Sequence, residues 1–468
     1  MGMRVSVGAV RSWVVVLLGI AAWVVRYAVW WNEYEVHRVA VQGCEWPSVQ
    51  GRGGAVRQQR PTSRKKRERV WDGEGQGEDE DVARVLVISD THLLGPRGHW
   101  LDRMRREHAM ARVYGEAVDA LRPDAVIHMG DLTDEGSHSW DAPWAKVLRR
   151  AHAMFALPLP LDVPLHVVPG NHDVGPPGHN VNDWTHMRMQ DRWERWEEEF
   201  GRTDAVFLVK GVPFVSVNAM ALEVRGDGPK KRAWEDEGAG GRNRAKKGKS
   251  PVGPERFKPC DVTRTARYFL DTLHAAEVNG SRVDGFYPGR TAHARDVAAL
   301  RASAARPILL THMPLHRASD KKCDAGQADQ VDDSKYGYRD EYIDGDDVLS
   351  GQVTRALLEA AVPRLVLSGH THRHCRSPAN RSSDPRRPEE VTVSTLSWRN
   401  RDDPSFVLLT ASARIPDAAG VMVAKCPIWR ESLVFQSYAQ AGAVVVALLA
   451  AAVALPAWAL RKDKVKPD

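Results

Sequence analysis

Five short blocks of polar residues along the chain carry side chains that are able to bind metal ions. They occur in the order Asp90-Thr91-His92, Gly130-Asp131, Gly170-Asn171-His172-Asp173, Thr311-His312 and Gly369-His370-Thr371-His372. Carboxylates suit hard divalent ions such as Mn²⁺, whereas imidazoles suit Zn²⁺ and iron. A pair of divalent ions about 3.5–4 Å apart can supply a hydroxide nucleophile, neutralise charge on phosphoryl oxygens and assist a poor alkoxide leaving group. The blocks therefore predict hydrolysis of a phosphate ester.

Each block directly follows a run of apolar residues that predicts a buried strand. The runs are 83–89, 125–129, 165–168, 307–310 and 364–368. Ligands in α/β proteins bind at the carboxyl ends of the strands, and a glycine before a ligand lets the backbone approach closely. A lone histidine after a strand, such as His312, is more often structural than a ligand. The prediction of a metal site therefore depends on the joint order of all five blocks.

This ordered set resembles the calcineurin-like metallophosphoesterase superfamily. The resemblance implies an α/β fold, namely a β-sandwich flanked by helices, and an active enzyme because every position of the pattern is filled. It implies that one divalent ion is held by Asp90, His92 and His372, and a second by Asn171, His312 and His370. Asp131 would bridge the two ions, and manganese is the expected metal.

The same resemblance gives the third block a role in proton transfer. His172 would stand beside the metals, stabilise charge on the phosphoryl oxygens and protonate the leaving alkoxide, while hydroxide held by the metals attacks phosphorus. Asp173 would orient the His172 ring. These two residues are the expected catalytic pair.

Both ends of the chain contain apolar segments, and residues 12–31 and 439–460 are each predicted to form a transmembrane helix. The first segment could instead be a cleaved signal peptide. It lacks an Ala-x-Ala site, however, and its Trp30-Trp31 pair resembles an interfacial aromatic belt, so a membrane anchor is favoured. Basic residues flank the two spans on their outer sides. They predict a cytoplasmic N-terminus at 1–11, a cytoplasmic tail at 461–468 and a lumenal chain between the spans.

Short signals near this topology carry less weight. Sequons begin at Asn279 and Asn380, and a glycosylated lumenal domain would accommodate both. The last five residues, Lys464-Val465-Lys466-Pro467-Asp468, resemble the dilysine retrieval signal of endoplasmic-reticulum membrane proteins, which would be recognised by the COPI coat. An ordinary stop-transfer cluster of basic residues is the alternative, and both interpretations can hold together.

The five cysteines would all be lumenal, where disulfides can form. Cys44 follows the first span and Cys426 precedes the second, so a bridge between them is the preferred hypothesis. Cys323 and Cys375 each follow a metal block and could form another bridge, although Cys375 could instead be a thiol near the metals. The odd count leaves at least one cysteine, for example Cys260, without a partner in the chain.

Composition and low-complexity segments define the remaining organisation. The chain has 468 residues and a net charge of +6, but much of the positive charge lies in two low-complexity runs, so nucleic-acid binding is not predicted. Residues 32–82 read as a partly disordered lumenal linker, and 83–438 as the lumenal catalytic domain with a disordered insertion at about 225–258. That insertion could bind anionic headgroups, but a solvated loop is the simpler interpretation. Residues 182–200 predict a helix that packs on the sheet.

Stretches outside the metal blocks point to one branch of the superfamily. They are Cys44-Glu45-Trp46-Pro47, Leu93 to Asp102, Asp134-Glu135-Gly136, Asp347 to Ser350 and Ser397 to Phe406. Together they resemble the GPI-anchor-remodelling metallophosphoesterases. The resemblance implies removal of ethanolamine phosphate from the second mannose of the anchors of GPI-linked proteins. It also implies a membrane location in the endoplasmic reticulum, its exit sites and the cis-Golgi, and a role in transport of these proteins.

Two other functions stay open at the level of the sequence. A lumenal phosphatase acting on phosphomonoesters or on other lipid-linked phosphodiesters would use the same ligands. A non-catalytic receptor or scaffold for GPI-linked cargo would use the fold for binding alone, but the complete ligand set and His172 argue against it. The loops at 175–204, 317–342 and 397–406 are expected to shape the substrate mouth.

Overall fold

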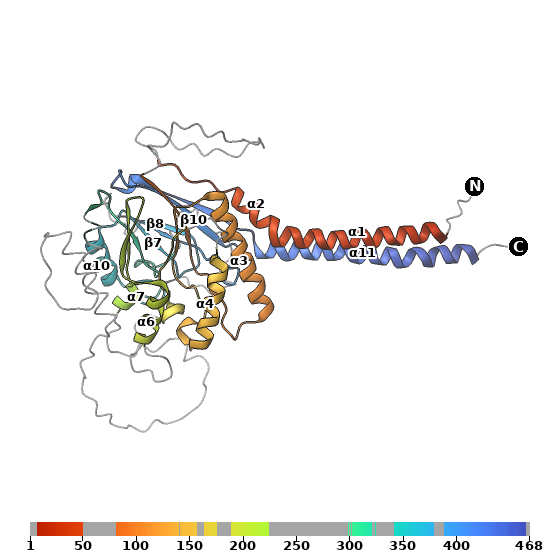
Figure 1. The fold of residues 1–468 in the computed structure, drawn as a ribbon, viewed down its shortest axis with the longest axis horizontal. Coiled ribbons are helices and arrows are strands. Elements are labelled where there is room, and N and C mark those ends of the chain that lie inside the picture. The colour runs from red at the N-terminus through yellow and green to blue at the C-terminus, as the bar shows by residue number, and fades with distance from the viewer. Residues whose placement is uncertain are drawn as a thin grey trace, which may run out of the picture.

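Two β-sheets lie face to face at the centre of the domain, and helices cover their outer faces (Figure 1). The computed structural model describes residues 7–49, 81–139, 141–156, 163–175, 189–223, 302–320, 341–378 and 388–464, with residues 298, 300 and 323. The two packed sheets confirm the predicted sandwich. The low-complexity stretches at 51–80 and 225–258 and the sequons lie outside the described residues.

The first sheet has the order β11-β10-β1-β2-β3. Its strands are β1 (Val82–Ile88), β2 (Ala125–His128), β3 (Leu165–Val167), β10 (Ser405–Ser412) and β11 (Val421–Pro427). The neighbours β1, β2 and β3 run parallel. Their carboxyl ends therefore meet at one end of the sheet.

The second sheet has the order β4-β5-β6-β7-β9-β8. Its strands are β4 (Ala205–Val209), β5 (Val212–Ser216), β6 (Ile308–Leu310), β7 (Leu365–Ser368), β8 (Cys375–Pro378) and β9 (Glu389–Thr392). The run from β5 through β6 and β7 to β9 is parallel. Both sheets thus present a set of parallel strand ends.

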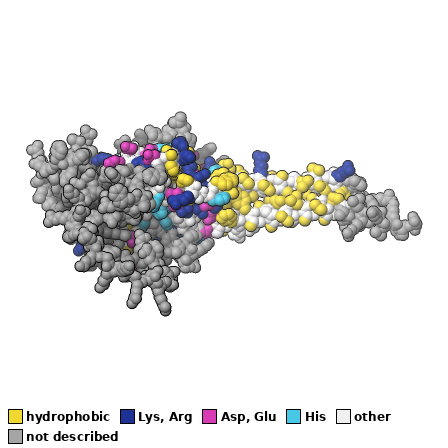
Figure 2. All heavy atoms as spheres, turned by 90° about the horizontal axis from the view of Figure 1, so that it is seen from below, with side chains coloured by type: hydrophobic (Ala, Val, Ile, Leu, Met, Phe, Trp, Pro, Cys, Tyr) yellow, Lys and Arg dark blue, Asp and Glu magenta, His cyan; other side chains and the backbone are white. Residues whose placement is uncertain are grey.

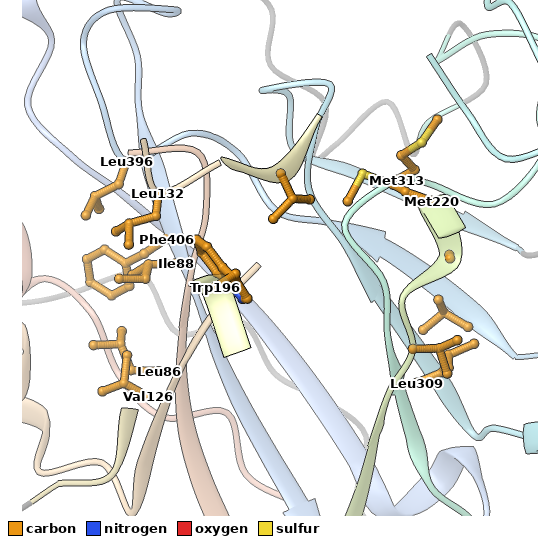
Figure 3. Close-up of a cluster of buried hydrophobic side chains, with 14 of the residues drawn as sticks. Leu86, Ile88, Val126, Leu132, Trp196, Met220, Leu309, Met313, Leu396 and Phe406 are labelled. Carbon is orange, nitrogen blue, oxygen red and sulfur yellow. The ribbon is translucent and has the colours of Figure 1, made fainter. Parts of the chain in front are cut away.

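Alternating side chains along these strands build two separate layers of core, because neighbouring residues of a strand point to opposite faces. Between the sheets lie residues such as Val85, Val87, Phe214 and Leu367. Strand residues that alternate with them, such as Leu86, Ile88 and Leu309, point to the outer faces and pack with side chains of other elements. Figure 3 shows two such groups, one with the helix residue Trp196 and one with the helix residue Met220. Since both faces of the central strands are buried, these strands read as continuous apolar runs.

The helices of the domain contribute the other side of the outer core. They are α3 (Trp100–Leu121), α4 (Asp141–Phe155), α5 (Asn171–Val174), α6 (Met189–Phe200), α7 (Ala219–Leu222) and α10 (Gly351–Ala361), with short 3-10 turns at Gly136–His138 and Ala418–Gly420. The helix predicted within 182–200 is present as α6. Its Trp193 and Trp196 are buried, and Trp196 contacts Trp144 of α4 with ring centroids 6.2 Å apart.

Two long helices from opposite ends of the chain, α1 (Val7–Trp30) and α11 (Glu431–Lys464), lie side by side and project from the domain (Figure 1). We call this antiparallel pair of helices the hairpin. Two helical segments are long and apolar enough to cross a membrane: Val10–Gln42, which extends beyond α1, and Glu431–Pro456 within α11. Polar contacts tie the helices at the domain end. Asn32 Nδ2 donates to Ser437 Oγ over 3.0 Å, and the Tyr438 hydroxyl donates to Glu33 Oε1 over 2.6 Å.

The segment after the first span differs from the predicted linker at 32–82. A π-helix, η1 (Trp31–Glu35), and α2 (Val36–Gln42) continue α1 without a break. Val36 and Val41 are fully buried, since α2 packs along α3. Val36 and Val41 lie on the face of α2 that contacts the domain. The first residues of the expected linker are therefore helical and belong to the folded domain.

Both predicted disulfides are present, Cys44–Cys426 and Cys323–Cys375. The first joins the end of α2 to β11 and so fastens the membrane-proximal segments to the sheet. The second joins the loop after β6 to the start of β8. Cys375 is therefore not a free thiol near the metals, and Cys260 lies outside the described residues.

Candidate metal centre

The five polar blocks meet at the carboxyl ends of β1, β2, β3, β6 and β7. One group contains Asp90, His92, Asp131 and His372, and a second contains Asp131, His312 and His370. Within each group, one donor atom from every residue lies within 4.8 Å of the others. Asn171 joins the second group, because its Oδ1 lies 3.0 Å from His312 Nε2. The structure therefore brings together all seven residues that the sequence suggested as ligands, with Asp131 shared between the groups.

In the first group, imidazole nitrogens and carboxylate oxygens face one another. His92 Nε2 lies 3.0 Å from His372 Nε2 and 3.6 Å from Asp131 Oδ2. Asp90 Oδ1 is 3.6 Å from His372 Nε2, and this buried oxygen accepts no hydrogen bond from any described residue. Burying a carboxylate oxygen without a partner costs free energy of folding, and a bound cation would remove this cost. The donor set therefore fits a divalent ion.

In the second group, hydrogen bonds to the backbone aim the imidazoles. His312 Nδ1 lies 2.8 Å from the Met129 carbonyl, which leaves Nε2 directed at Asp131 Oδ1, 3.4 Å away. His370 Nε2 lies 2.9 Å from the Asp346 carbonyl, and its buried Nδ1 has no hydrogen bond among the described residues. Bonding of one ring nitrogen to a carbonyl fixes the tautomer and offers the other as a ligand. The arrangement fits a second divalent ion.

Five of these seven residues adopt left-handed backbone angles. The φ values are 51° at Asp90, 44° at His92, 51° at Asp131, 70° at His370 and 58° at His372. Non-glycine residues in this region cost of order 1–3 kcal/mol each and persist where the surrounding structure enforces them, as in functional sites. Gly369 explains how one of these turns fits, because a Cβ there would collide with Ser89 and Asp90.

Charge coupling follows from the crowding of acids and imidazoles. Burial raises the pKa of Asp90 to about 6. Burial also opposes ionisation of Asp131, but His312, His172 and His92 hold the pKa of that carboxyl well below its usual range. Burial alone would lower the pKa of His312, yet the Asp131 charge raises it to about 9. A cation that binds His312 Nε2 would compete with a proton for this nitrogen.

His172 lies at the mouth of the centre. Its backbone N–H donates to Asp131 Oδ1 over 2.8 Å, and its ring packs against the His92 ring with centroids 4.8 Å apart. Its Nδ1 lies 2.9 Å from the Asp134 carbonyl. Because Nδ1 is bonded to this carbonyl and 42% of the side chain is exposed, Nε2 is the ring nitrogen left for a substrate.

Asp173 does not take the place expected for it. Its carboxylate accepts hydrogen bonds from the backbone N–H groups of Leu132, Thr133 and Gly170 and from the Thr133 hydroxyl, at 2.8–3.1 Å. It lies inside the α5 turn, where its carboxylate satisfies free N–H groups, and it holds together the loops after β2 and β3. The expectation that Asp173 orients the His172 ring is therefore wrong, since the ring is bonded to Asp134.

Three residues at the centre have no assigned role in the sequence-based prediction. Asp134 lies between His92 Nδ1, 3.4 Å from its Oδ1, and Arg399, whose Nη2 is 2.8 Å from its Oδ2. Asn400 Nδ2 lies 3.3 Å from His372 Nε2. Two hints of these residues were present in the sequence: Asp134 lies three residues after Asp131, and Arg399 and Asn400 lie in the loop at 397–406 that was expected to shape the substrate mouth. Neither indicates which side chains turn inward.

A scaffold of two sheets with these residues at the strand ends defines a metal-dependent phosphoesterase with a calcineurin-like fold. Residues 83–259 match the family model described as calcineurin-like phosphoesterase. The chain is 31% identical over 424 residues to Metallophosphoesterase 1 of Gallus gallus, covering 90% of this chain and 86% of that protein. It is 32% identical to Metallophosphoesterase 1 of Mus musculus, covering 89% and 84%. The chain belongs to the Metallophosphoesterase 1 family.

A solved structure of a dimetal phosphatase from Danio rerio is also similar. It covers 74% of this chain and 99% of its own, with 12% identity and a TM-score of 0.33. A likeness at this TM-score carries no weight for function.

Divalent ions held by the two groups would supply Lewis acidity for attack on phosphorus. The protein side chains do the rest. His172 can hold and donate a proton at the exposed Nε2, and Asp134 fixes the ring through its carbonyl. Arg399 holds the Asp134 carboxylate from the opposite side.

Proposed function

We propose that this chain removes ethanolamine phosphate from the second mannose of GPI anchors. It does so as a manganese-dependent phosphodiesterase in the lumen of the endoplasmic reticulum, its exit sites and the cis-Golgi. The observation that carries the proposal is the joining of the two ligand groups to a two-helix hairpin within one folded unit. A site held at a membrane suits a substrate that is itself anchored in that membrane.

The chemistry of the bond fits the centre. Ethanolamine phosphate is linked to mannose through a phosphodiester, so cleavage at mannose expels a sugar alkoxide that needs a proton. The exposed His172 Nε2 is placed to donate it. Hard carboxylate and amide oxygens from Asp90, Asp131 and Asn171 stand beside the imidazoles, and this mixture suits Mn²⁺.

The proposed location is supported by the disulfides and by the charge of the ends. Two disulfides are typical of an oxidising compartment such as the lumen of the secretory pathway. Basic residues outside both spans favour a lumenal domain. The dilysine-like tail would then face the cytosol, where the COPI coat could bind it.

The test is mass spectrometry of GPI glycans from cells that lack this protein, rescued with the wild-type chain or with His172→Ala. We expect an extra ethanolamine phosphate on the second mannose in the deficient cells, removed by the wild-type chain alone. The matched control is Asp119→Ala, an exposed carboxylate on α3 that should rescue fully.

Unchanged glycans in the deficient cells would refute the GPI substrate. Purified protein would then be assayed on phosphomonoesters and on other lipid-linked phosphodiesters, which the same ligands could serve. Stoichiometric binding of GPI glycans with no turnover by metal-loaded protein would instead indicate a receptor.

A further inference from the structure

Three large apolar side chains are exposed together at the start of α3. Trp100 is 59% exposed, Leu101 47% and Met104 58%. Apart from the hairpin and its base, the described part of the domain exposes only two other large apolar side chains to this degree, Leu208 and Ile343. We call Trp100, Leu101 and Met104 the α3 patch. The metal chemistry described above makes no use of it.

The direction of α3 places the patch on the side of the hairpin. Helix α3 runs parallel to the chain segment that leaves the hairpin after α1, as three contacts show. Near its C-terminus, the Leu121 carbonyl accepts from Trp46 Nε1 over 2.8 Å. Further toward its N-terminus, Arg112 lies over the Tyr34 ring and His108 Nε2 is 3.2 Å from the Glu33 carbonyl. Each step from Leu121 toward Trp100 therefore approaches the hairpin.

The α3 patch lies beyond the last of these contacts, nearer to the N-terminus of α3. At a rise of 1.5 Å per residue, Met104 lies about 6 Å and Trp100 about 12 Å further along α3 than His108. Glu33 lies next to Trp30 and Trp31, and the Tyr438 hydroxyl is bonded to it. The start of α3 therefore lies at the end of the domain from which the hairpin projects (Figure 1).

Arg105 connects the patch to the base of α11. Its guanidinium pairs with Glu431 and lies 4.7 Å from the centre of the Phe435 ring. Phe435 is itself 54% exposed. Figure 2 shows hydrophobic side chains and Lys or Arg side chains gathered where the hairpin meets the domain. Arg105, which lies within the stretch of α3 that carries the patch, thus brings the start of α3 next to the base of α11.

We propose that the α3 patch is a third membrane contact, which inserts into the interfacial layer of the bilayer that holds α1 and α11. Tryptophan prefers this layer because its ring is apolar and its N–H is polar. Arg97, three residues before Trp100, is 76% exposed and pairs with Glu135, and its positive charge would be attracted to anionic headgroups. The inference rests on insertion of the hairpin in a membrane and is independent of the GPI substrate.

The contact ties the metal centre to the lipid surface. Seven residues separate Trp100 from the predicted ligand His92, and the first of them is fixed, since Leu93 N–H donates to the Leu132 carbonyl and Asp134 N–H to the Leu93 carbonyl. The hairpin is joined firmly to the domain, so without a further contact the domain and the two helices can tilt together in the bilayer. A third contact beside the hairpin fixes the tilt and so the height of the centre above the headgroups.

Lipid contact is measured with a fluorophore on the full chain in nanodiscs that hold one copy each. The label is attached to Met104→Cys or to Asp119→Cys in a Cys260→Ser background, and the nanodiscs contain phosphatidylcholine with or without a doxyl quencher on the acyl chain. Asp119 is the matched control, on the same helix, 62% exposed but at the far end. We expect quenching at Met104→Cys to exceed that at Asp119→Cys by at least about twofold, since interfacial segments enter the headgroup and acyl boundary.

A second measurement avoids placing the label within the patch. The label on Arg97→Cys should lose about half or more of its quenching when Trp100, Leu101 and Met104 are all replaced by Gln, since the apolar contact is removed. Hydrolysis of bis(p-nitrophenyl) phosphate with Mn²⁺ should remain unchanged in this variant, which shows that it is folded. Equal quenching at Met104→Cys and Asp119→Cys, or no change at Arg97→Cys, would overturn the proposal. A patch covered by another protein or a second copy would give the first of these results.

Discussion

At the scale of single residues, the centre separates those that would hold cations from the one that would move a proton. His312 lies in the buried second group, 3.4 Å from Asp131, whereas His172 is partly exposed and bonded through its ring to a carbonyl. We expect His172→Ala to lower kcat by about 10²- to 10⁴-fold while both metals remain bound. His312→Ala should lose metal as well as activity. Elemental analysis of purified variants, combined with hydrolysis of a soluble phosphodiester, distinguishes the two effects; metal loss in His172→Ala would contradict this division.

Arg399 should matter although it touches neither ligand group. It holds Asp134, and Asp134 holds the His172 ring and lies beside His92. Arg399→Gln should therefore lower kcat by roughly tenfold or more, with partial recovery in Arg399→Lys. Arg97→Gln is the control, because Arg97 also pairs with a carboxylate, Glu135, but at an exposed site. Equal activity of the two Gln variants would show that the Arg399 contact is dispensable.

Residue types at strand ends located the five polar blocks, and the family resemblance selected the seven clustered residues among them; a parallel sheet then brings the ends of its strands together. Residue types were not sufficient for Asp173 and Asp134. Both follow a predicted ligand closely, and only the turn of the loop decides which carboxylate faces the His172 ring and which faces backbone N–H groups. The left-handed angles at Asp90 and His370 are likewise imposed by tertiary packing and leave no local signal.

At the scale of elements, the loop between β6 and α10 supports the second group from outside. The Asp346 carbonyl accepts from His370, Ala318 and Tyr342 are bonded through the backbone, and Cys323 is bonded to Cys375. Replacing Cys323 and Cys375 together by Ser should weaken binding of one metal by roughly 10- to 100-fold, since supporting contacts orient a ligand. Metal titration checks this. A variant with wild-type affinity for both metals would show that the other contacts of the loop, among them the Arg317–Glu390 ion pair, are sufficient to anchor it.

The hairpin β4–β5 contains a buried acid that should make stability depend on pH. Burial raises the pKa of Asp204 to about 7, although the Asn218 N–H bonded to it favours the charged form. The folded state therefore keeps a proton that the unfolded state releases near pH 4, so the contribution to stability is complete below about pH 4 and is lost as pH rises through 7. The midpoint of thermal unfolding in detergent should fall between pH 5 and pH 7.5. Asp204→Asn should reduce this fall, and an identical fall in both proteins would exclude Asp204 as its cause.

Most strands and helices were predictable because long apolar runs, and the glycine, proline and polar residues that end them, are local features of the sequence. The boundary of the membrane segment was less so. The stretch after Trp31 contains charged residues and reads as a linker, yet Val36 and Val41 are buried against α3 and Cys44 is bonded to Cys426. Only contacts with distant segments show that the hairpin enters the domain as a continuous helix, with its base inside the core.

At the scale of the whole molecule, the order of the chain places the catalytic domain between two spans, so both termini must lie on the same side of a membrane if both helices cross it. The basic flanks of the spans predict that this side is the cytosol. In sealed microsomes, protease added outside should remove tags from both termini and leave a protected domain, and detergent should abolish the protection. Peptide N-glycosidase should increase the mobility of the wild-type chain but not of a variant with Asn279→Gln and Asn380→Gln. Cleavage of the domain without detergent would show that the domain faces the cytosol, where the metal centre could not reach a lumenal GPI glycan.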